Sequence, residues 1–307
     1  MTITPIWLQK PTKYCEELHS KLIDGAWIER KYDGVSTQAT FNQGSIGLYA
    51  NAKAKVSGQF TDRTDKCPHI IEELKQLEFD NIHLQGEIYS DHLSTEKENF
   101  DYTSGILKDH NSYIRQCAEG KTKIVIYDLP SARYSTYKER YIILQDILEG
   151  HSFEYVSLAP ILGINENDSW IEYFNDMVSK NLEGIVLHQP SALYKYSAKS
   201  NGRNPKAFKI KTQNEQEVCV IEKIEGTSTG KFKGTVGKLI ALDKNGKQFR
   251  IGSLAVTNEM RDYIWNEVEC PFIAECRAMS ETKLDYRHAV LTRLRLDKDV
   301  DSWNKED

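Results

Sequence analysis

The residues with the clearest chemical potential are Lys31-Tyr32-Asp33-Gly34, which follow the short apolar stretch 27–30. We predict that Lys31 ends a strand and that Gly34 permits the turn into the next strand. The amine would then lie at the end of a strand, beside a turn. A nucleophilic lysine must be neutral, and from a reference pKa of ~10.4 deprotonation at pH 7 costs roughly 4–5 kcal/mol. Burial beside other cations and a metal ion would offset that cost. Taken alone, the motif also describes a surface lysine in a hairpin.

Two carboxylates and a tyrosine occupy positions at which a nucleotide or a metal ion could bind. Glu87 lies on the polar face of the alternating segment 82–89, where it can meet a ribose hydroxyl or a metal ion. Glu183 stands at the entry of the apolar run 184–186, a usual place for a metal-binding acid. Tyr127 ends the apolar strand 124–126, and its ring could stack on a base or belong to the core. The structural alternatives are an exposed strand glutamate for Glu87 and a helix-to-strand turn for Glu183.

The segment 190–214 is basic in a chain that is acidic overall. It contains no Asp or Glu, and its cations are Lys195, Lys199, Arg203, Lys206, Lys209 and Lys211. Alternation puts Lys209 and Lys211 on one strand face and the two apolar residues Phe208 and Ile210 on the other. Two like charges on one face repel unless an anion lies between them, and phosphate is the natural candidate. The segment therefore predicts a surface that follows a phosphate backbone.

A second alternating pattern lies near the end of the chain. Arg293 and Arg295 share one strand face, while Leu294 and Leu296 share the other. We expect the leucines to point into a barrel and the arginines into a groove, where their guanidinium groups suit phosphate oxygens. The alternative is a basic edge strand that discourages aggregation.

Taken in order, these motifs resemble the covalent nucleotidyltransferase superfamily, and within it the short ATP-dependent DNA ligases of viruses and phages. The resemblance extends from about residue 27 to residue 298, and it includes two glycine-punctuated strings, 230–239 and 249–253, in the C-terminal part. The matching elements are Lys31-Tyr32-Asp33-Gly34, Gln85-Gly86-Glu87-Ile88, Ile126-Tyr127-Asp128-Leu129, Glu183-Gly184-Ile185-Val186, Phe208-Lys209-Ile210-Lys211 and Arg293 to Lys298.

The resemblance implies a three-step reaction on nicked double-stranded DNA, with ATP as substrate and Mg²⁺ or Mn²⁺ as the metal. Lys31 attacks the α-phosphorus of ATP and pyrophosphate leaves. The lysyl-AMP passes AMP to the 5′-phosphate of a nick, and the 3′-hydroxyl then attacks, seals the strand and releases AMP. Such an enzyme serves DNA replication, repair or recombination.

The resemblance also implies a role for each matching residue. Glu29 lies against adenine and Tyr127 stacks on it. Glu87 holds the ribose or a metal-bound water, and Glu183 serves the metal. The α-phosphate is gripped by Lys209 and Lys211, and pyrophosphate is oriented by Arg293, Arg295, Asp297 and Lys298. We assign contacts with DNA to Lys199, Arg203, Lys206, Lys231 and Lys233.

The sequence departs from the family pattern at two places. The family usually has an arginine two residues after the motif glycine, and this position is Ser36. A further arginine is usual on the next hairpin, whereas the segment 49–55 contains none. Lys53 or Lys55 could substitute as point charges, but a lysine does not provide a planar fork.

Two other classes of function are compatible with parts of the pattern. An RNA ligase or a capping guanylyltransferase shares the lysine and most strand motifs, although the C-terminal strings and the segment Arg293–Lys298 favour a DNA ligase. Asp33 fits DNA ligases and capping enzymes better than RNA ligases. A protein that binds nicks or single strands without turnover is the other alternative, which the missing arginines motivate. Its weakness is that binding alone needs no nucleophile.

The elements that must position these residues indicate an α+β fold with two domains. Residues 1–212 form an adenylation domain with antiparallel sheets, and residues 213–307 form a small OB-fold β-barrel. In the first domain we predict helices over 12–24, 69–78, 137–148 and 170–180, and strands over 27–30, 35–41, 46–49, 82–89, 124–129, 182–188 and 207–211. In the second we predict five strands, with a helix over 258–268 after the third.

The composition of the chain limits the classes of protein to which it can belong. The chain has 307 residues, a formal net charge of −5, and 39% hydrophobic and 28% charged residues, which excludes a protein that coats nucleic acid by bulk charge. No apolar run of about 18 residues and no leader sequence is present, so we expect a cytoplasmic protein, in the host's cytoplasm if the protein is viral. We also expect a monomer. The six cysteines are widely spaced and predict free buried thiols.

Overall fold

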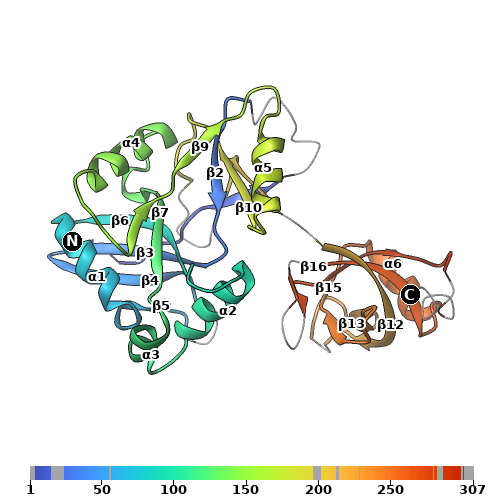
Figure 1. Ribbon diagram of the computed structural model, residues 1–307. Helices are drawn as coiled ribbons and strands as arrows, with labels where there is room; N and C mark the ends of the chain where they lie inside the picture. Colours follow the sequence, from blue (N-terminus) through green and yellow to red (C-terminus); the bar gives the residue numbers. More distant parts are fainter. Residues whose placement is uncertain are drawn as a thin grey trace. The chain divides into compact units, whose positions relative to one another are not determined.

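The chain divides into two compact units, Met1–Lys211 and Thr212–Asp307 (Figure 1). The computed structural model describes residues 4–14, 24–54, 57–195, 202–211, 214–227, 229–278, 280–281, 286–298 and 300. The predicted domain boundary, between residues 212 and 213, lies outside these residues. Within them, no helix has the length and apolar character that crossing a membrane requires.

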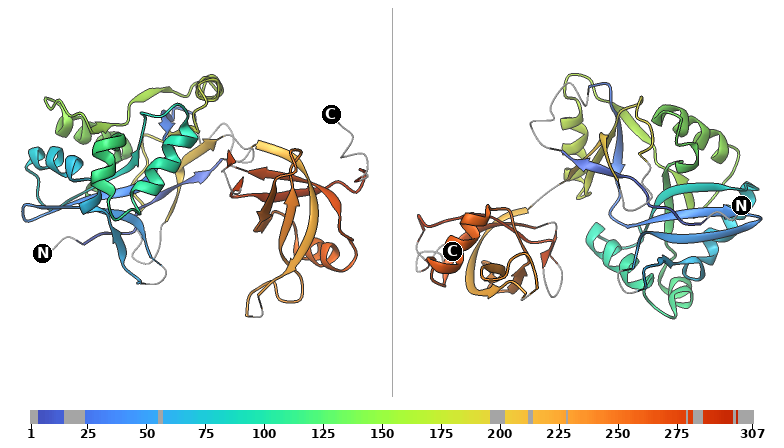
Figure 2. Two further views of the ribbon diagram at one scale, coloured as in Figure 1. Left: turned by 60° about the horizontal axis from the view of Figure 1, so that its bottom comes forward. Right: turned by 180° about the vertical axis from the view of Figure 1, so that it is seen from behind.

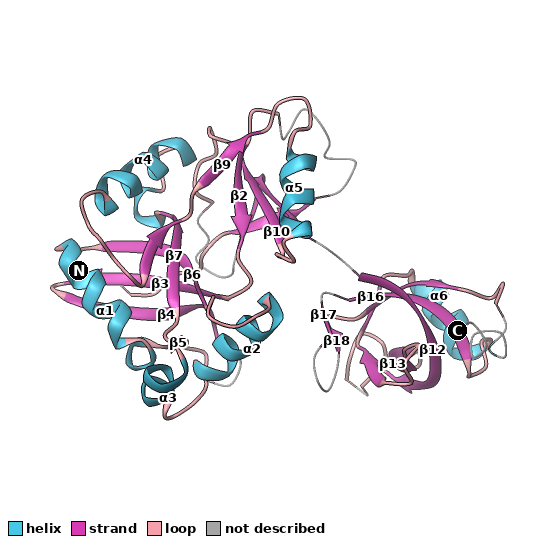
Figure 3. Ribbon diagram, viewed as in Figure 1, coloured by secondary structure: helices cyan, strands magenta, loops and turns pink. Residues whose placement is uncertain are grey.

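The first unit contains two sheets whose strands are mostly antiparallel (Figure 3). One sheet has the order β1 (Lys10–Lys13), β11 (Arg203–Lys211), β10 (Gly184–His188), β2 (Trp27–Lys31) and β9 (Ile161–Ile164), with β1 parallel to β11. The other has the order β5 (Phe60–Asp62), β4 (Ser45–Lys53), β3 (Val35–Asn42), β6 (Ile82–Tyr89), β7 (Lys123–Asp128) and β8 (Val156–Leu158), with β7 parallel to β8.

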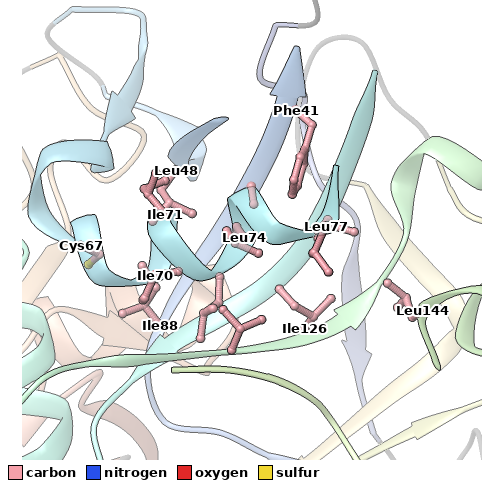
Figure 4. Packing of buried hydrophobic residues seen from close by; sticks show 14 of the residues in the cluster. Phe41, Leu48, Cys67, Ile70, Ile71, Leu74, Leu77, Ile88, Ile126 and Leu144 are labelled. Atoms are coloured by element: carbon pink, nitrogen blue, oxygen red, sulfur yellow. The ribbon is translucent and has the colours of Figure 1, made fainter. Parts of the chain in front are cut away.

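Helices cover each sheet with apolar side chains. On the six-stranded sheet, Ile70 and Leu74 of α1 (Pro68–Leu74) pack with Leu48, Ile88 and other strand residues in one buried cluster (Figure 4). Also in the first unit are α2 (Glu96–Ile106), α3 (Ser112–Glu119) and α4 (Tyr137–Leu148). The five-stranded sheet is covered by α5 (Trp170–Ser179), whose apolar side chains pack against β2 and β10.

Local sequence explains where two of these helices begin. The Thr95 hydroxyl caps α2 by accepting from the Glu98 backbone, and the Glu98 side chain accepts from the Thr95 backbone. Thr136 and Glu139 make the same reciprocal pair at the start of α4. Each pair satisfies backbone donors that a helix start leaves unpaired.

The second unit contains a six-stranded sheet around its own core. Its order is β14 (Gln248–Ile251), β13 (Val236–Leu242), β12 (Asn214–Glu225), β16 (Phe272–Ala278), β19 (Val290–Leu294) and β15 (Ser253–Leu254). The long strand β12 is strongly bent (Figure 2). Helix α6 (Asn258–Asn266) follows β15, and a short pair, β17 (Ser280–Glu281) and β18 (Tyr286–Arg287), follows β16. The two strands at the ends of this order, β14 and β15, are consecutive in the chain and are separated by Gly252 alone.

Several expected elements differ from the structure. Instead of the start of a helix over 12–24, strand β1 occupies Lys10–Lys13, and residues 15–23 of that segment are not among those described. Strand β19 ends at Leu294, and Leu296 is 58% exposed rather than directed into a core. Among the described residues the cysteine side chains are free as expected, but Cys117 is exposed and Cys270 is half-buried, whereas Cys67, Cys219 and Cys276 are buried. Cys15 lies outside the described residues.

The segment that carries Lys31 is also not a hairpin. Strand β2 belongs to the five-stranded sheet and β3 to the six-stranded sheet, so residues 32–34 carry the chain from one sheet to the other. Gly34 is required here by a close approach. A Cβ atom at this position would lie 2.3 Å from the Ile88 carbonyl oxygen of β6, well inside van der Waals contact.

We therefore expect Gly34→Ala to lower the free energy of unfolding by about 2–3 kcal/mol, because β6 must move to admit the methyl group. The matched control is Gly105→Ala in α2, where an added Cβ meets no atom within 4 Å. Its expected effect is under about 1 kcal/mol. Chemical denaturation of both variants measures the difference, and equal stabilities would contradict this packing argument.

Candidate active site

A cavity of about 510 Å³ lies within the first unit and is lined by residues from both of its sheets. Glu29, Lys31 and Lys209 come from the five-stranded sheet, whereas Glu87 and Tyr127 come from the six-stranded sheet. These five are residues for which the sequence predicted a role. The volume lies in the range of small-ligand sites.

The Lys31 amine faces the carboxylate of Glu183 at the end of β2. The two strands β2 and β10 pair so that Gly184 lies opposite Lys31, and this register brings Lys31 Nζ to 2.6 Å from Glu183 Oε2. The other oxygen of Glu183 lies 3.8 Å from Lys211 Nζ. Lys31 and Glu183 are mostly buried, with side chains 20% and 10% exposed. Glu183 therefore binds both the predicted nucleophile, Lys31, and one of the two lysines predicted to hold the α-phosphate, Lys211.

These neighbours decide the charge of Lys31. Burial alone would lower the pKa of the amine, but Glu183 first, and then Glu87 and Asp33, outweigh it and raise the pKa above 10.5. Lys31 is thus an ammonium group in this structure. The expectation that its surroundings favour the neutral amine does not hold while Glu183 is its partner.

Glu87 lies opposite Ser36 in the pairing of β6 with β3. Desolvation raises the pKa of Glu87 to about 8, and the nearby acids Glu183 and Asp33 add to the rise, while Lys31 opposes it. Most Glu87 side chains are therefore protonated at neutral pH. A neutral carboxyl group can donate as well as accept a hydrogen bond, and an arriving cation would convert it to the ionised form.

Glu29 lies in a buried aromatic corner of the cavity. The Tyr137 hydroxyl donates a hydrogen bond to Glu29 Oε1, and the ring of Tyr137 stacks on that of His188 with centroids 4.2 Å apart. Desolvation raises the pKa of Glu29 to about 8 and lowers the pKa of His188 to about 4. Both groups are consequently neutral near pH 7, and this corner of the cavity carries no net charge.

Tyr127 lies near the end of β7 and contacts residues of its own six-stranded sheet. Its hydroxyl lies 3.4 Å from Ser36 Oγ and 3.5 Å from Gln85 Nε2. Burial raises the pKa of this phenol, so it remains protonated. The side chain is partly exposed to the cavity rather than enclosed in the core.

Behind Tyr127, a buried ion pair fixes the cavity wall. Arg140 of α4 binds both oxygens of Asp128, with Nε to Oδ1 at 2.5 Å and Nη2 to Oδ2 at 3.1 Å. Asp128 also accepts from Gln9 Nε2 at 2.9 Å, which attaches the N-terminal segment to the sheet. A bidentate arginine pair with further hydrogen bonds is the geometry in which a buried pair is satisfied.

Cations gather on the side of the cavity that β1 and β11 form. Lys10 lines the cavity and lies opposite Arg203 in the register of β1 and β11. Burial, then Arg203, lowers the pKa of Lys10, and burial, then Lys31, lowers the pKa of Lys209. Arg203 and Lys206 are exposed, as DNA contacts would require, whereas Lys199 is not among the described residues.

The remaining predicted site residues belong to the second unit. Lys231 and Lys233 are exposed, and so is Arg293. Arg295 is enclosed by acids: its Nη1 lies 2.5 Å from Glu217 Oε1 and 3.1 Å from Glu275 Oε1, and its Nη2 lies 2.8 Å from Asp297. Lys298 binds the other oxygen of Glu217 at 2.8 Å.

Among the described residues, no group of three or more His, Cys, Asp or Glu side chains is arranged to hold a metal ion. Glu87 and Glu183 are two carboxylates near one amine, and their electrostatic coupling raises the pKa of Glu87. Such a pair fits Mg²⁺, which keeps several waters and takes one or two carboxylates together with substrate phosphates.

Sequence reasoning missed several residues that line or shape the cavity. Lys10 was assigned to no element, and Arg63, His188 and Tyr137 were not singled out. The only available signal was local, namely a lysine beside a proline and an arginine within a polar loop. These residues matter because of contacts between the sheets, and the order of residues along the chain does not reveal such contacts.

Removal of the Glu183 charge should lower the pKa of Lys31. In Glu183→Gln the carboxylate at 2.6 Å is gone, and burial, which favours the neutral amine, then dominates. We expect the pH profile of Lys31 modification by an amine-reactive ester, followed by peptide mass spectrometry, to shift to lower pH by one unit or more (about tenfold in reactivity at fixed pH). The exposed Lys75 in the same digest is the internal control, and its modification profile should not shift. An unshifted Lys31 profile would contradict this electrostatic account.

Glu29 should make stability depend on pH. Because the folded pKa of about 8 exceeds the ordinary 4.5, the folded state holds a proton that the unfolded state releases, and stability falls as pH rises between these values. Glu29→Gln removes this loss, so its stability relative to wild type should increase from pH 5 to pH 8 by a few kcal/mol. Denaturation at several pH values tests this. The control Glu72→Gln, at an exposed side chain, should show a constant difference.

Comparisons with known proteins agree on one family. A family model described as "ATP dependent DNA ligase domain" matches residues 7–211. A "DNA ligase" of Methanococcus maripaludis (strain C7) is 26% identical over 188 residues, which are 54% of this chain and 31% of that protein. A "DNA ligase 1" of Methanosarcina acetivorans is 25% identical over 197 residues, covering 60% of this chain and 32% of that protein. The chain thus spans about a third of the length of these curated relatives.

Solved structures share the fold. A structure described as "DNA binding with a minimal scaffold: Structure-function analysis of Lig E DNA ligases" has a TM-score of 0.70 at 19% identity, covering 94% of this chain and 98% of the other. A structure named Pmar-Lig_PreS3 has a TM-score of 0.73 at 19% identity, covering 95% and 68%. The family match includes both sheets of the first unit and every cavity-lining residue named above, and on this basis the chain belongs to the ATP-dependent DNA ligase domain family.

Proposed function

We propose that the chain is an ATP-dependent DNA ligase that acts as a monomer on nicked duplex DNA and joins a 5′-phosphate to a 3′-hydroxyl. One observation carries the proposal: in a chain of this family, a mostly buried lysine amine and several further cations surround a cavity of nucleotide size. The reaction passes through a lysyl-AMP on Lys31 and then through a DNA-adenylate.

In the first step, the Lys31 amine attacks the α-phosphorus of ATP. The Nζ–P bond forms, the P–O bond to pyrophosphate breaks, and the proton of the ammonium group must leave before attack. Glu183, at 2.6 Å, is the group placed to hold that proton. Lys209 and Lys211 hold the α-phosphate oxygens, and Lys211 keeps Glu183 as a second anionic neighbour at 3.8 Å.

The purine base occupies the neutral corner of the cavity. Tyr127 offers its ring for stacking, and Glu29 offers its carboxyl group, which Tyr137 orients. A protonated Glu29 can donate one hydrogen bond and accept another, as the edge of adenine requires. Glu87 is the partner for a ribose hydroxyl or for a metal-bound water.

Glu87 and Glu183 are the residues that would hold Mg²⁺ or Mn²⁺. When bound, such an ion neutralises charge on the phosphates of ATP. For this chain, the consequence is electrostatic, because a cation near the two carboxylates would weaken the hold of Glu183 on the Lys31 proton.

For the second unit we propose an OB-fold barrel. Support comes from the strand order, in which β12 pairs with both β13 and β16, and β19 pairs with β16 and in parallel with β15. If β14 and β15 act as one strand bent at Gly252, the order returns to its start. We propose that exposed Lys231 and Lys233 contact DNA, together with Arg203, Lys206 and Lys199 of the first unit, and that Arg293, Arg295, Asp297 and Lys298 orient pyrophosphate.

The alternative of a protein that binds nicks without turnover stems from the absence of arginine at Ser36 and over 49–55. The ion pair of Lys31 with Glu183 disfavours it, because a binding protein gains nothing from burying an amine beside a carboxylate.

The decisive test is covalent capture of AMP by the purified protein. With Mg²⁺ and ATP labelled at the α-phosphate, we expect one AMP per chain on Lys31, and no transfer from γ-labelled ATP. Lys31→Ala should lower labelling at least 1,000-fold, whereas Lys75→Ala, at an exposed lysine, should label normally. Labelling of Lys31→Ala would refute the assigned nucleophile. Binding of nicked duplex by a wild-type protein that forms no adduct would favour the alternative.

A further inference from the structure

Arg63 contributes a guanidinium group to the cavity wall, although it belongs to none of the motifs found in the sequence. It follows β5 directly, and its side chain is partly buried and lines the cavity. Nη1 donates to the Ser36 carbonyl oxygen at 3.1 Å and to Thr37 Oγ1 at 2.7 Å. These two contacts anchor one nitrogen of the group to strand β3.

The charge of Arg63 has no partner in the described part of the chain. No carboxylate there lies within 4.0 Å of its nitrogens, and Nε and Nη2 make no hydrogen bond to the described residues. Burial lowers the pKa of the guanidinium, which means that its surroundings disfavour the charge. Cys67 and then Glu87 oppose this shift without reversing it.

A desolvated cation without a counterion is costly, and an anion that enters the cavity relieves the cost. The guanidinium group is suited to one class of anion in particular. With Nη1 held by β3, the pair Nε and Nη2 remains, and two adjacent N–H groups of arginine bind a phosphate in bidentate geometry.

We infer that Arg63 binds a phosphate group of the substrate in the cavity, and so supplies the planar fork that the sequence lacks at Ser36. This inference rests on the proposed ligase function. Arg63 reaches Ser36 across 27 positions of sequence, because the β3–β4–β5 meander places the end of β5 only one strand away from β3. Lys53, a conceivable substitute, is exposed and lies over the Phe60 ring at 5.5 Å, and it does not line the cavity.

Two single-turnover assays test the inference. One measures self-adenylation with Mg²⁺ and ATP, and the other measures sealing of a pre-adenylated nick by unadenylated protein. Arg63→Ala and the longer, neutral Arg63→Gln should each slow at least one assay tenfold or more. Arg115→Ala, which removes an exposed arginine on α3, should stay within twofold in both. Ser36→Arg added to Arg63→Ala should recover at least part of the lost rate, because it returns a guanidinium to this wall.

The pattern of loss identifies the phosphate. A loss confined to self-adenylation assigns Arg63 to the phosphates of ATP, and a loss confined to sealing assigns it to the 5′-phosphate of the nick. A loss in both assigns it to the AMP phosphate, which the two assays share. Each of these outcomes supports the inference.

Rates within twofold of wild type in both assays would overturn it. Thermal unfolding identifies variants that have lost their fold, and if Arg63→Ala is one of them, Arg63→Gln decides, since its amide can still donate to Ser36. If wild type forms no lysyl-AMP, the proposed function fails, but Arg63 remains testable by fluorescence anisotropy with nicked duplex and with ATP. Arg63→Gln should then weaken binding of ATP or of the 5′-phosphorylated nick tenfold, without changing that of a 5′-hydroxyl nick. Unchanged binding of both phosphate ligands would refute the inference.

Discussion

The ion pair between Lys31 and Glu183 depends on the register of two adjacent strands and determines the chemical state of the cavity. Gly184 lies opposite Lys31 in the pairing of β10 with β2, and a Cβ atom on Gly184 would lie 2.2 Å from the Ile210 carbonyl oxygen of β11. Close packing of three strands thus places the carboxylate against the amine. A one-residue shift would turn these side chains to opposite faces of the sheet and separate them.

Desolvation shifts the pKa of acids and of amines in the cavity in opposite directions and leaves them in different states. It raises the pKa of Glu29 and Glu87 to about 8, so both are mostly neutral at pH 7. It lowers the pKa of Lys10 and Lys209 from a much higher starting value, so these amines stay nearer to their charged form. The cavity therefore retains positive charge, which suits a ligand that carries several phosphates.

The second unit handles its cations differently. Arg295 and Lys298 share Glu217, and Arg295 also binds Glu275 and Asp297. The hydrogen bond from Arg295 lowers the pKa of Asp297 to about 2. An arginine that already has several acidic partners must exchange them before it can hold pyrophosphate. Two of these acids, Glu217 of β12 and Glu275 of β16, lie far from Arg295 in sequence, whereas Asp297 is two residues away.

The sequence by itself determined the elements with strong local signals and the identity of the reactive group. The alternation over 82–89, the apolar periodicity over 137–148 and the Lys31 motif each lie within a few residues, and β6 and α4 have the predicted bounds. Only the tertiary structure decided that residues 32–34 join two sheets, that β1 precedes the motif, that Glu183 keeps Lys31 charged, and that Arg63 stands beside Ser36. Local patterns follow from backbone geometry and side-chain polarity, which neighbouring residues specify. Desolvation, ion pairing and strand register depend on contacts between residues far apart in the chain, and these arise only when the two sheets pack.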